Sequence, residues 1–447
     1  MRFAVSLILL IAPLAQAAEP RPVSFQQDLA PLLLERCQGC HGPDKIKGGY
    51  RLDTFEKLLQ PGESGVTPIT PGRPDTSELY RLLATSVDED RMPNKGEPLT
   101  TTQINLFKRW IEDGAKYDGP SPTASLTSIA GDREPAAPPE VYRQPIPITA
   151  LAFSPDASIL AASGYHEVTL WDPATGHLVG RIPRMAERVF SLDFSPDGKR
   201  LAVAAGQPGS LGEVRLCDVE HRKAHKPLDR LSDVVLVVKF SPDGSLLAAG
   251  GADNLIRLYD VATGKRLQTI EEHADWVTGL AFSPDGTKLA SASRDKSARV
   301  VNVRDGEPLA AYLGHEEAVY AVGWASDGKS LLSAGHDRKI HAWVLAESKG
   351  LGRIVGLSGD PLQIAIAGPH AFVCTTDGLL RQYNVNAREP LRDYVKSGDW
   401  LYSVAVNDKQ HWVAAGGYSG GITLWDTATG AKLRGWLAAP GYLPAPH

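Results

Sequence analysis

Apolar and polar positions follow two different patterns along the chain. In the first part, apolar residues recur at helical spacing in three runs, SFQQDLAPLLLERC, PDTSELYRLLAT and TTTQINLFKRWIEDGA. Polar loops of mixed composition separate these runs. The first pattern predicts a small all-α domain over residues 22–117.

The expected helices have recognisable beginnings. Ser24 with Gln27 has the spacing of a capping box, in which two polar side chains satisfy the free N–H groups at a helix start. Thr100 or Thr101, with Gln103 behind it, is the expected cap of the last helix. Pro31 lies inside the first apolar run. Because proline cannot sit in a helix interior without disturbing it, that helix should begin just before Pro31 or bend there.

The second pattern consists of short alternating runs and begins near residue 141. The segment VTGLAFSPDGTKLASAS predicts a strand, a Pro-Asp-Gly turn and a second strand, and ARVVNV and PLAAYL predict two more. Residues 118–140, which lie between the two patterns, are rich in Pro, Ser, Thr and Ala without a clear period. They are predicted to be a linker.

The strand pattern repeats. The motif Phe-Ser-Pro-Asp recurs at intervals of 41, 46 and 42 residues, counted from Ser154, Ser195, Ser241 and Ser283. A second landmark closes each unit, at Trp171, Cys217, Tyr259, Val301, Trp343, Tyr383 and Trp425. Landmarks near a 42-residue period predict an all-β, seven-bladed propeller over residues 141–439, followed by a tail at 440–447. Either residues 140–146 or residues 431–438 should supply the outer strand that closes the ring.

The unit GHEEAVYAVGWASDGKSLLSAGHDRKIHAW resembles the WD-repeat family. The resemblance implies a tetrad of His315, Ser333, Asp337 and Trp343 that forms hydrogen bonds within one blade and supports the fold. It also implies that the propeller binds other proteins. A neighbouring unit repeats the first three tetrad positions but has Val301 in place of the tryptophan.

The first residues, MRFAVSLILLIAPLAQAAEP, combine a basic start, an apolar run and a small-residue cleavage pattern. They predict a signal peptide at residues 1–17 and a soluble, exported protein of the periplasm, with no membrane span after cleavage. Apolar residues make up 43% of the chain and charged residues 22%, which indicates a globular protein. The net charge of −5, without a basic block, argues against a nucleic-acid partner.

The segment RCQGCH carries the main candidate chemistry. Cys37, Cys40 and His41 have the spacing for covalent attachment of a c-type haem, but they also fit half of a zinc site or a thiol redox pair. Export favours the haem. So does the lack of another His or Cys pair in residues 18–120, because zinc requires further ligands. Met92, in a loop before the last helix, is a candidate for the second axial position.

The pieces LAPLLLERCQGCHGPDKIKGGYRLD, PGRPDTSELYRLL, DRMPNKGEPLT and LFKRWIEDGA resemble the planctomycete-type cytochrome c domain. The resemblance implies one covalent haem c, held by thioether bonds to Cys37 and Cys40, with His41 and Met92 as the axial pair. Asn94 stands where that family usually has a second proline after the methionine.

The sequence therefore predicts an exported c-type cytochrome that transfers electrons, with the propeller as a protein-interaction scaffold and no catalytic residues. Its expected partners are a redox protein and a protein that docks on the propeller. Two alternatives remain open at this point. One is a haem enzyme of the nitrite-reductase-like cytochrome-plus-propeller type. The other is a haem-based redox sensor, which would require Met92 to be displaceable.

Overall fold

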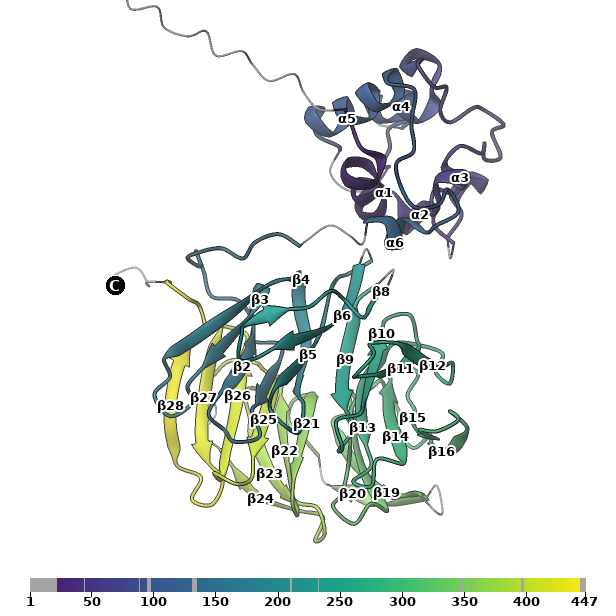
Figure 1. Ribbon diagram of the computed structural model, residues 1–447. Helices are drawn as coiled ribbons and strands as arrows, with labels where there is room; N and C mark the ends of the chain where they lie inside the picture. The colour runs from purple at the N-terminus through teal and green to yellow at the C-terminus, as the bar shows by residue number, and fades with distance from the viewer. Residues whose placement is uncertain are drawn as a thin grey trace, which may run out of the picture. The chain divides into compact units, whose positions relative to one another are not determined.

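The computed structural model describes residues 22–43, 45–87, 89–94, 98–130, 135–209, 211–231, 233–345, 349–354, 356–394 and 398–442 (Figure 1). The chain divides into two compact units, with the boundary after Ala130. The predicted signal peptide at residues 1–17 lies outside the described residues. None of the described helices has the length and apolar composition that a membrane span requires.

The first unit is helical in the part of the chain that is described. Its helices are α1 (Ala30–Arg36), α2 (Gln38–His41), α3 (Phe55–Leu58), α4 (Glu78–Ala84), α5 (Thr101–Glu112) and α6 (Leu126–Ala130), with short helical turns at Phe25–Leu29, Lys47–Gly49 and Pro74–Thr76. They enclose one apolar core that includes Phe25, Leu33, Phe107 and Trp110. The helical unit thus buries one face of each long helix, as the spacing of the apolar residues predicts.

The helix starts follow the predicted local chemistry. The Ser24 hydroxyl accepts from the Gln27 N–H at 2.9 Å, and Thr100 and Gln103 form a complete capping box. Pro31 does not interrupt a helix, because α1 begins at Ala30 and Pro31 lies in its first turn. There proline removes no intrahelical hydrogen bond.

Part of the predicted linker at 118–140 is helical and belongs to the first unit. Residues 126–130 form α6, and Leu126 and Ile129 are buried in the core of the helical unit. The Leu126 N–H donates to the Asp53 carbonyl oxygen at 2.7 Å. Two apolar residues three positions apart suffice for one helical turn to dock, and the surrounding Pro, Ser and Thr residues concealed that short pattern.

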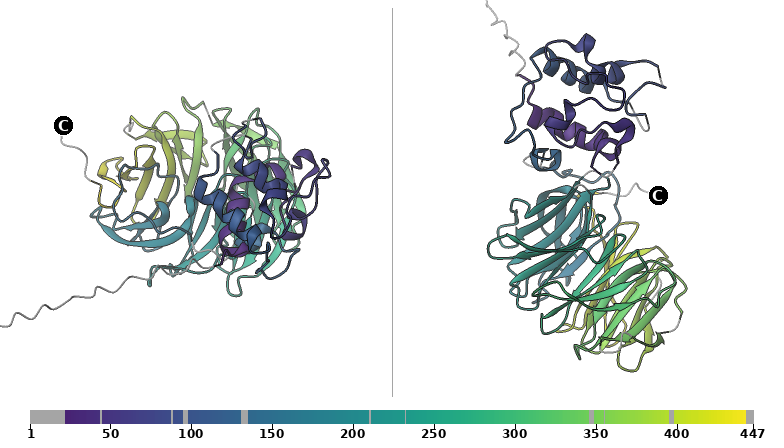
Figure 2. Two further views of the ribbon diagram at one scale, coloured as in Figure 1. Left: turned by 90° about the horizontal axis from the view of Figure 1, so that it is seen from above. Right: turned by 90° about the vertical axis from the view of Figure 1, so that its right-hand side faces the viewer.

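The second unit is a β-propeller-like domain of antiparallel sheets (Figures 1 and 2). Its eight-stranded sheet contains β1 (Leu151–Phe153), β2 (Leu160–Ser163), β3 (Tyr165–Trp171), β4 (Leu178–Phe194), β5 (Arg200–Gln207), β6 (Leu211–Asp218), β7 (Lys223–Ala224) and β8 (Asp229–Leu231). Four-stranded sheets follow, made of β9 (Val235–Phe240), β10 (Leu246–Gly251), β11 (Ile256–Asp260) and β12 (Arg266–Ile270), then β13 (Val277–Phe282), β14 (Lys288–Ser293), β15 (Ala298–Asn302) and β16 (Pro308–Tyr312). The remaining ones are β17 (Val319–Trp324), β18 (Ser330–Gly335), β19 (Lys339–Val344) and β20 (Lys349–Ile354), then β21 (Pro361–Ala367), β22 (His370–Thr375), β23 (Leu380–Asn384) and β24 (Glu389–Asp393), and finally β25 (Leu401–Asn407), β26 (Trp412–Gly417), β27 (Gly421–Asp426) and β28 (Lys432–Leu437).

The long strand β4 joins two four-stranded arrays into the eight-stranded sheet. Its first half pairs with β3 from Leu178 to Pro183, and its second half pairs with β5 from Arg188 to Phe194. A central cavity of about 560 Å³ is lined by residues of β1, β4, β9, β13, β17, β21 and β25. The innermost strands of the sheets therefore surround a common axis.

The repeated Ser-Pro-Asp-Gly segments form the predicted turns. The Ser283 hydroxyl donates to the Asp285 carboxylate at 2.5 Å, and Gly286 has a φ of 71°, which a residue with a side chain rarely adopts. The same Ser-to-Asp bond occurs in the turns at Ser154, Ser195 and Ser241. These turns join β1 to β2, β4 to β5, β9 to β10 and β13 to β14.

The ring is closed by side-chain packing and a few hydrogen bonds between the first and last sheets. Residues 432–437 form β28, the outer strand of the last sheet, so the C-terminal candidate is the one that supplies this strand. The Ser403 hydroxyl donates to the Ile148 carbonyl oxygen at 2.7 Å across the junction. Apolar residues of β1, β2, β26 and β27 share one buried cluster there.

Candidate functional site

The two cysteines and the histidine of the RCQGCH segment lie on one tight turn between two helices. Cys37 ends α1 and precedes α2, and its carbonyl oxygen accepts from the N–H groups of Cys40 and His41, both at 3.1 Å. Gly42 caps the C-terminal end of α2. A side chain does not fit at this position, because a Cβ would lie 2.6 Å from the Gln38 carbonyl oxygen. The turn thus carries three potential ligand or attachment groups within five residues.

Both thiols of this turn are free. Cys37 and Cys40 are half-buried and form no disulfide, and the Cys37 side chain packs against the core of the helical unit. Burial raises the pKa of the Cys37 thiol to about 12. Cys217 in β6 and Cys374 in β22 are also free, but both are fully buried between strands. The pair in the helical unit is therefore the one whose thiols remain partly accessible.

His41 is oriented by the loop that follows it. Its Nδ1 lies 3.2 Å from the carbonyl oxygen of Tyr50, and the Tyr50 hydroxyl donates to the Leu58 carbonyl oxygen at 2.8 Å. The Leu52 N–H donates to the carbonyl oxygen of His41 at 2.9 Å. A carbonyl oxygen can only accept, so in the neutral ring Nδ1 carries the proton and Nε2 keeps its lone pair. His41 is thus held in the tautomer that a metal ligand requires.

Met92 lies in the loop after α4. Its N–H donates to the Leu82 carbonyl oxygen at 2.9 Å, and Arg91 donates to the Pro93 carbonyl oxygen at 3.2 Å. The Met92 side chain is partly buried and packs against the same core as Cys37. The fold therefore brings a thioether, which is a soft iron ligand, to the core that also supports the cysteine turn.

The donor set of the helical unit fits a covalently attached haem. Two free thiols are spaced for two thioether bonds, the following imidazole has an available Nε2, and a methionine sulfur packs on the same core. His41 is the only histidine of residues 18–120, so this unit lacks the further nitrogen ligand that a mixed zinc site would use.

Three of the four predicted tetrad residues are joined in the sheet β17–β20. His315 Nδ1 lies 3.0 Å from Asp337 Oδ2, and its Nε2 lies 2.8 Å from Ser333 Oγ. Trp343 departs from the prediction, since its indole N–H has no hydrogen-bond partner among the described residues. Its ring instead stacks on Tyr312 at 5.3 Å between centroids. Packing has replaced the hydrogen bond that was expected of this residue.

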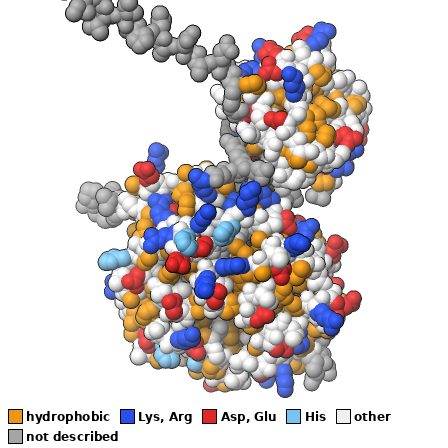
Figure 3. Space-filling model, in the orientation of Figure 1, with side chains coloured by type: hydrophobic (Ala, Val, Ile, Leu, Met, Phe, Trp, Pro, Cys, Tyr) orange, Lys and Arg blue, Asp and Glu red, His pale blue; other side chains and the backbone are white. Residues whose placement is uncertain are grey.

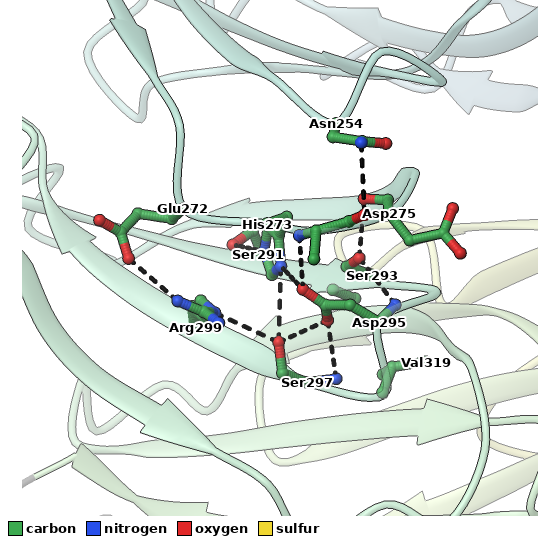
Figure 4. A network of polar contacts seen from close by, with 12 residues as sticks. Asn254, Glu272, His273, Asp275, Ser291, Ser293, Asp295, Ser297, Arg299 and Val319 are labelled. Atoms are coloured by element: carbon green, nitrogen blue, oxygen red, sulfur yellow. Dashed lines mark hydrogen bonds and ion pairs between the residues drawn. The ribbon is translucent and has the colours of Figure 1, made fainter.

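The sheet β13–β16 contains the matching network (Figure 4). His273 bonds to Asp295 through Nδ1 and to Ser291 through Nε2, both at 2.8 Å, and Asp295 also accepts from Ser297. Burial acts to raise the pKa of Asp295, but the hydrogen bonds from His273 and Ser297 outweigh it and hold that pKa well below its usual value. These groups hold loops to strands, and none of them lines the central cavity.

Sequence reasoning missed two polar residues beside the His315 network. His341 Nε2 lies 3.4 Å from Asp337 Oδ2, and the Tyr312 hydroxyl lies 2.7 Å from His341 Nδ1. Burial, followed by the charge of His341, lowers the pKa of His315 to about 4 despite the carboxylate of Asp337. A comparison between repeats could have singled out His341, which lies two residues before the landmark of its unit. Other units have an arginine at this position, namely Arg257, Arg299 and Arg381.

Surface charges on the second unit are mixed. On the face shown in Figure 3, Lys and Arg side chains are interspersed with Asp and Glu over the propeller-like domain. Hydrophobic side chains gather in patches on the visible face of the helical unit. No large surface area in this view carries only positive or only negative side chains.

Two family models match the chain. The model described as planctomycete cytochrome C matches residues 37–96, and the WD domain, G-beta repeat model matches residues 142–172, 223–260, 264–302, 306–343 and 388–426. The first match covers the cysteine turn and Met92, and the second covers parts of the β-sheet region, without β4–β6, β20–β23 or β28. The chain is thus a cytochrome-like domain of the planctomycete type fused to a region of WD repeats.

Relatives among known proteins match short stretches. "Protein hir1" of Emericella nidulans is 38% identical over 82 residues, which are 16% of this chain and 8% of that protein. "WD repeat-containing protein SL1-17" of Schistosoma mansoni is 37% identical over 108 residues, which are 24% of this chain and 34% of that protein. This chain therefore spans about a third or less of the length of these relatives.

Proposed function

We propose that the protein is an exported c-type cytochrome that carries one covalent haem and passes electrons, while its WD-repeat region docks a partner protein. Cys37 and Cys40 supply the two thioether bonds, and His41 and Met92 supply the axial ligands. We place the protein in the periplasm, on the basis of the signal-like first residues. A redox protein is the expected electron donor or acceptor.

The hydrogen bond between His41 Nδ1 and the Tyr50 carbonyl oxygen is the observation that carries this proposal. It fixes the histidine tautomer and leaves Nε2 as the ligand atom, one residue after two free thiols. A thiol redox pair has no need of such a histidine. The tight backbone turn at Cys37 and the steric requirement at Gly42 preserve the spacing between the three groups.

The residues of this unit favour electron transfer over catalysis. When bound, the haem supplies a one-electron iron couple whose potential a methionine ligand raises. With His41 and Met92 as its iron ligands, the haem would have no coordination position left for a substrate. Packing of Met92 on the core resists its displacement, which separates this proposal from the sensor alternative.

We further propose that the β-sheets form seven blades. In this interpretation β4 serves two blades, as the outer strand of the first and the inner strand of the second. The inner strands that line the central cavity support this division. The buried networks around His273 and His315 then act as blade supports, and the exposed loops and strand edges remain for a protein partner.

A reduced-minus-oxidised absorption spectrum of the full chain, produced in a bacterial host that attaches c-type haem, tests the proposal. We expect a single low-spin c-type haem that stays with the polypeptide after acid–acetone extraction. Replacement of Cys37 and Cys40 by alanine should release the haem, whereas the control Cys217→Ala should retain it. A second haem type in the spectrum would support the enzyme alternative instead.

A further inference from the structure

A second group of metal-ligating side chains lies in the sheet β17–β20. His315 precedes β17, Asp337 lies between β18 and β19, and His341 belongs to β19. Asp337 Oδ2 is 3.0 Å from His315 Nδ1 and 3.4 Å from His341 Nε2, and one ligand atom from each residue falls within 4.8 Å of the others. The three side chains are 0%, 1% and 6% exposed, so the group is enclosed.

We propose that these three residues form a divalent-metal site, with zinc as the ion that fits best. Two imidazole nitrogens and one carboxylate oxygen are a ligand set that zinc accepts at about 2.0–2.2 Å. In a tetrahedron with such bonds, neighbouring ligand atoms lie about 3.3–3.5 Å apart. The spacings of 3.0 and 3.4 Å about Asp337 are close to that value. A water molecule would complete the four-coordinate shell.

The surrounding residues orient the ligands as a metal site requires. Ser333 Oγ lies 2.8 Å from His315 Nε2, and the Tyr312 hydroxyl lies 2.7 Å from His341 Nδ1. In both imidazole rings, the nitrogen that points away from Asp337 therefore has a hydroxyl oxygen as its hydrogen-bond partner. Such outer contacts fix the tautomer and the ring orientation of metal-bound histidines.

Metal binding requires Nδ1 of His315 and Nε2 of His341 to be unprotonated, and the neighbouring hydroxyls allow this. Without metal, Nδ1 of His315 donates its proton to Asp337 and Nε2 accepts from the Ser333 hydroxyl. With metal, the proton resides on Nε2 and the Ser333 oxygen accepts it, because a hydroxyl can act in either sense. The ring remains neutral throughout. The carboxylate of Asp337 offsets one of the two positive charges of the ion.

The neighbouring sheet shows what the same network looks like without the second histidine. His273, Ser291 and Asp295 repeat the contacts of His315, Ser333 and Asp337. At the strand position of His341, which pairs with Ser333, that sheet has Arg299, which pairs with Ser291. A guanidinium group cannot ligate a metal ion because it offers no lone pair at neutral pH. The neighbouring network thus lacks the second imidazole, and it also has Ile270 at the position of Tyr312.

A metal at this position would link three segments of one sheet. The loop before β17, the turn between β18 and β19, and β19 itself would share one ion. A metal ion that binds the folded chain contributes its binding free energy to folding, so the expected role is to stabilise this sheet. The site is independent of the haem proposal, since all its ligands belong to the WD-repeat region.

Zinc uptake by the full chain tests the site. The protein carries Cys37→Ala and Cys40→Ala, so that free thiols in the helical unit cannot bind the probe. After chelation and removal of the chelator, titration with zinc chloride should give about one bound zinc per chain by elemental analysis, and zinc should raise the melting temperature. His341→Arg, which copies the neighbouring sheet, should abolish both effects.

Loss of zinc uptake in His341→Arg could also result from unfolding of the sheet, so a second variant should add a site instead of removing one. Arg299→His combined with Ile270→Tyr should create a second site and raise the uptake to about two zinc ions per chain. Cobalt added to the chain with an intact His341 should show the intense visible bands of a tetrahedral site. Equal zinc uptake with and without His341, or an absence of cobalt bands, would refute the proposed site.

Discussion

His41 and Tyr50 are joined by a hydrogen bond of 3.2 Å between the imidazole Nδ1 and a main-chain carbonyl oxygen. Tyr50 is held in turn by its hydroxyl, which donates to Leu58. A side-chain substitution cannot remove the main-chain carbonyl that binds His41. The contact is therefore best tested by removing the hydrogen bond from the Tyr50 hydroxyl to Leu58. The orientation of the histidine depends on the loop, and the loop depends on Tyr50.

Tyr50→Phe should weaken the loop without removing the haem. The loss of one hydrogen bond costs about 1 kcal/mol of stability, and the histidine ring gains freedom. We expect intact covalent attachment, a lower melting temperature of the helical unit, and a broader reduced haem spectrum. Tyr80→Phe, in α4, is the control and should leave the spectrum unchanged. An unaltered melting temperature in Tyr50→Phe would show that the bond to Leu58 does not support the site.

Met92→Ala should keep the haem attached but open one axial position. The potential should fall, because a methionine ligand raises it relative to water or another weak ligand. Added imidazole or carbon monoxide should then bind at concentrations that leave the wild type unchanged, as followed by absorption. Met185→Ala, in β4 of the WD-repeat region, serves as the control. If Met92→Ala left the potential and ligand binding unaltered, Met92 would not be an axial ligand.

Leu126→Ala should destabilise the helical unit even though it lies in a segment of linker-like composition. Leu126 is fully buried, so its truncation should cost about 2–5 kcal/mol. Leu59→Ala, at a position that is 38% exposed, should cost much less. Denaturant unfolding followed by tryptophan fluorescence of this unit would compare the two. Equal costs would mean that α6 does not belong to the core.

The stability of the WD-repeat region should fall in acid. Hydrogen bonds from serine hydroxyls, with Ser283 to Asp285 as one case, hold the pKa of the turn aspartates below the value of about 3.9 that they have in an unfolded chain. The folded state therefore binds fewer protons in this range. The resulting stabilisation is fully present above about pH 4 and is lost as the pH falls through the folded pKa.

Melting temperatures measured between pH 6 and pH 3 would show this dependence. Ser283→Ala should lower the melting temperature at pH 6 and make the decline toward pH 3 shallower, because the pKa of Asp285 returns toward its unfolded value. The exposed Ser326, in the turn between β17 and β18, provides the control Ser326→Ala. A parallel decline in wild type and Ser283→Ala would contradict the role of the serine bond.

Local features of the fold could be predicted from the sequence, and features that depend on distant contacts could not. The cap at Ser24, the capping box at Thr100 and the turn at Gly286 involve residues within a few positions of one another, and the structure confirms them. The docking of α6 depends on a core built by other helices. The strand β4 pairs with both β3 and β5 although it contains Gly180 and Pro183, which in sequence suggest a turn, and has a positive φ at Arg184.

The same distinction holds at the two candidate sites. The spacing of Cys37, Cys40 and His41 is local and indicated haem chemistry as one of three possibilities. The carbonyl partner of His41 lies nine residues away and appears only once the loop is folded. Trp343 and His341 are close in sequence, yet their contacts with Tyr312 arise across strands. No pattern of a single repeat could have indicated those contacts.

The intact mass of the purified, denatured full chain tests the central claim most directly. Wild-type protein from a host with c-type haem attachment should have the mass of the mature chain plus one haem. The Cys37→Ala, Cys40→Ala variant should have the mass of its polypeptide alone. A wild-type mass without haem, with Cys37 and Cys40 joined in a disulfide, would contradict the cytochrome assignment and support a thiol redox pair.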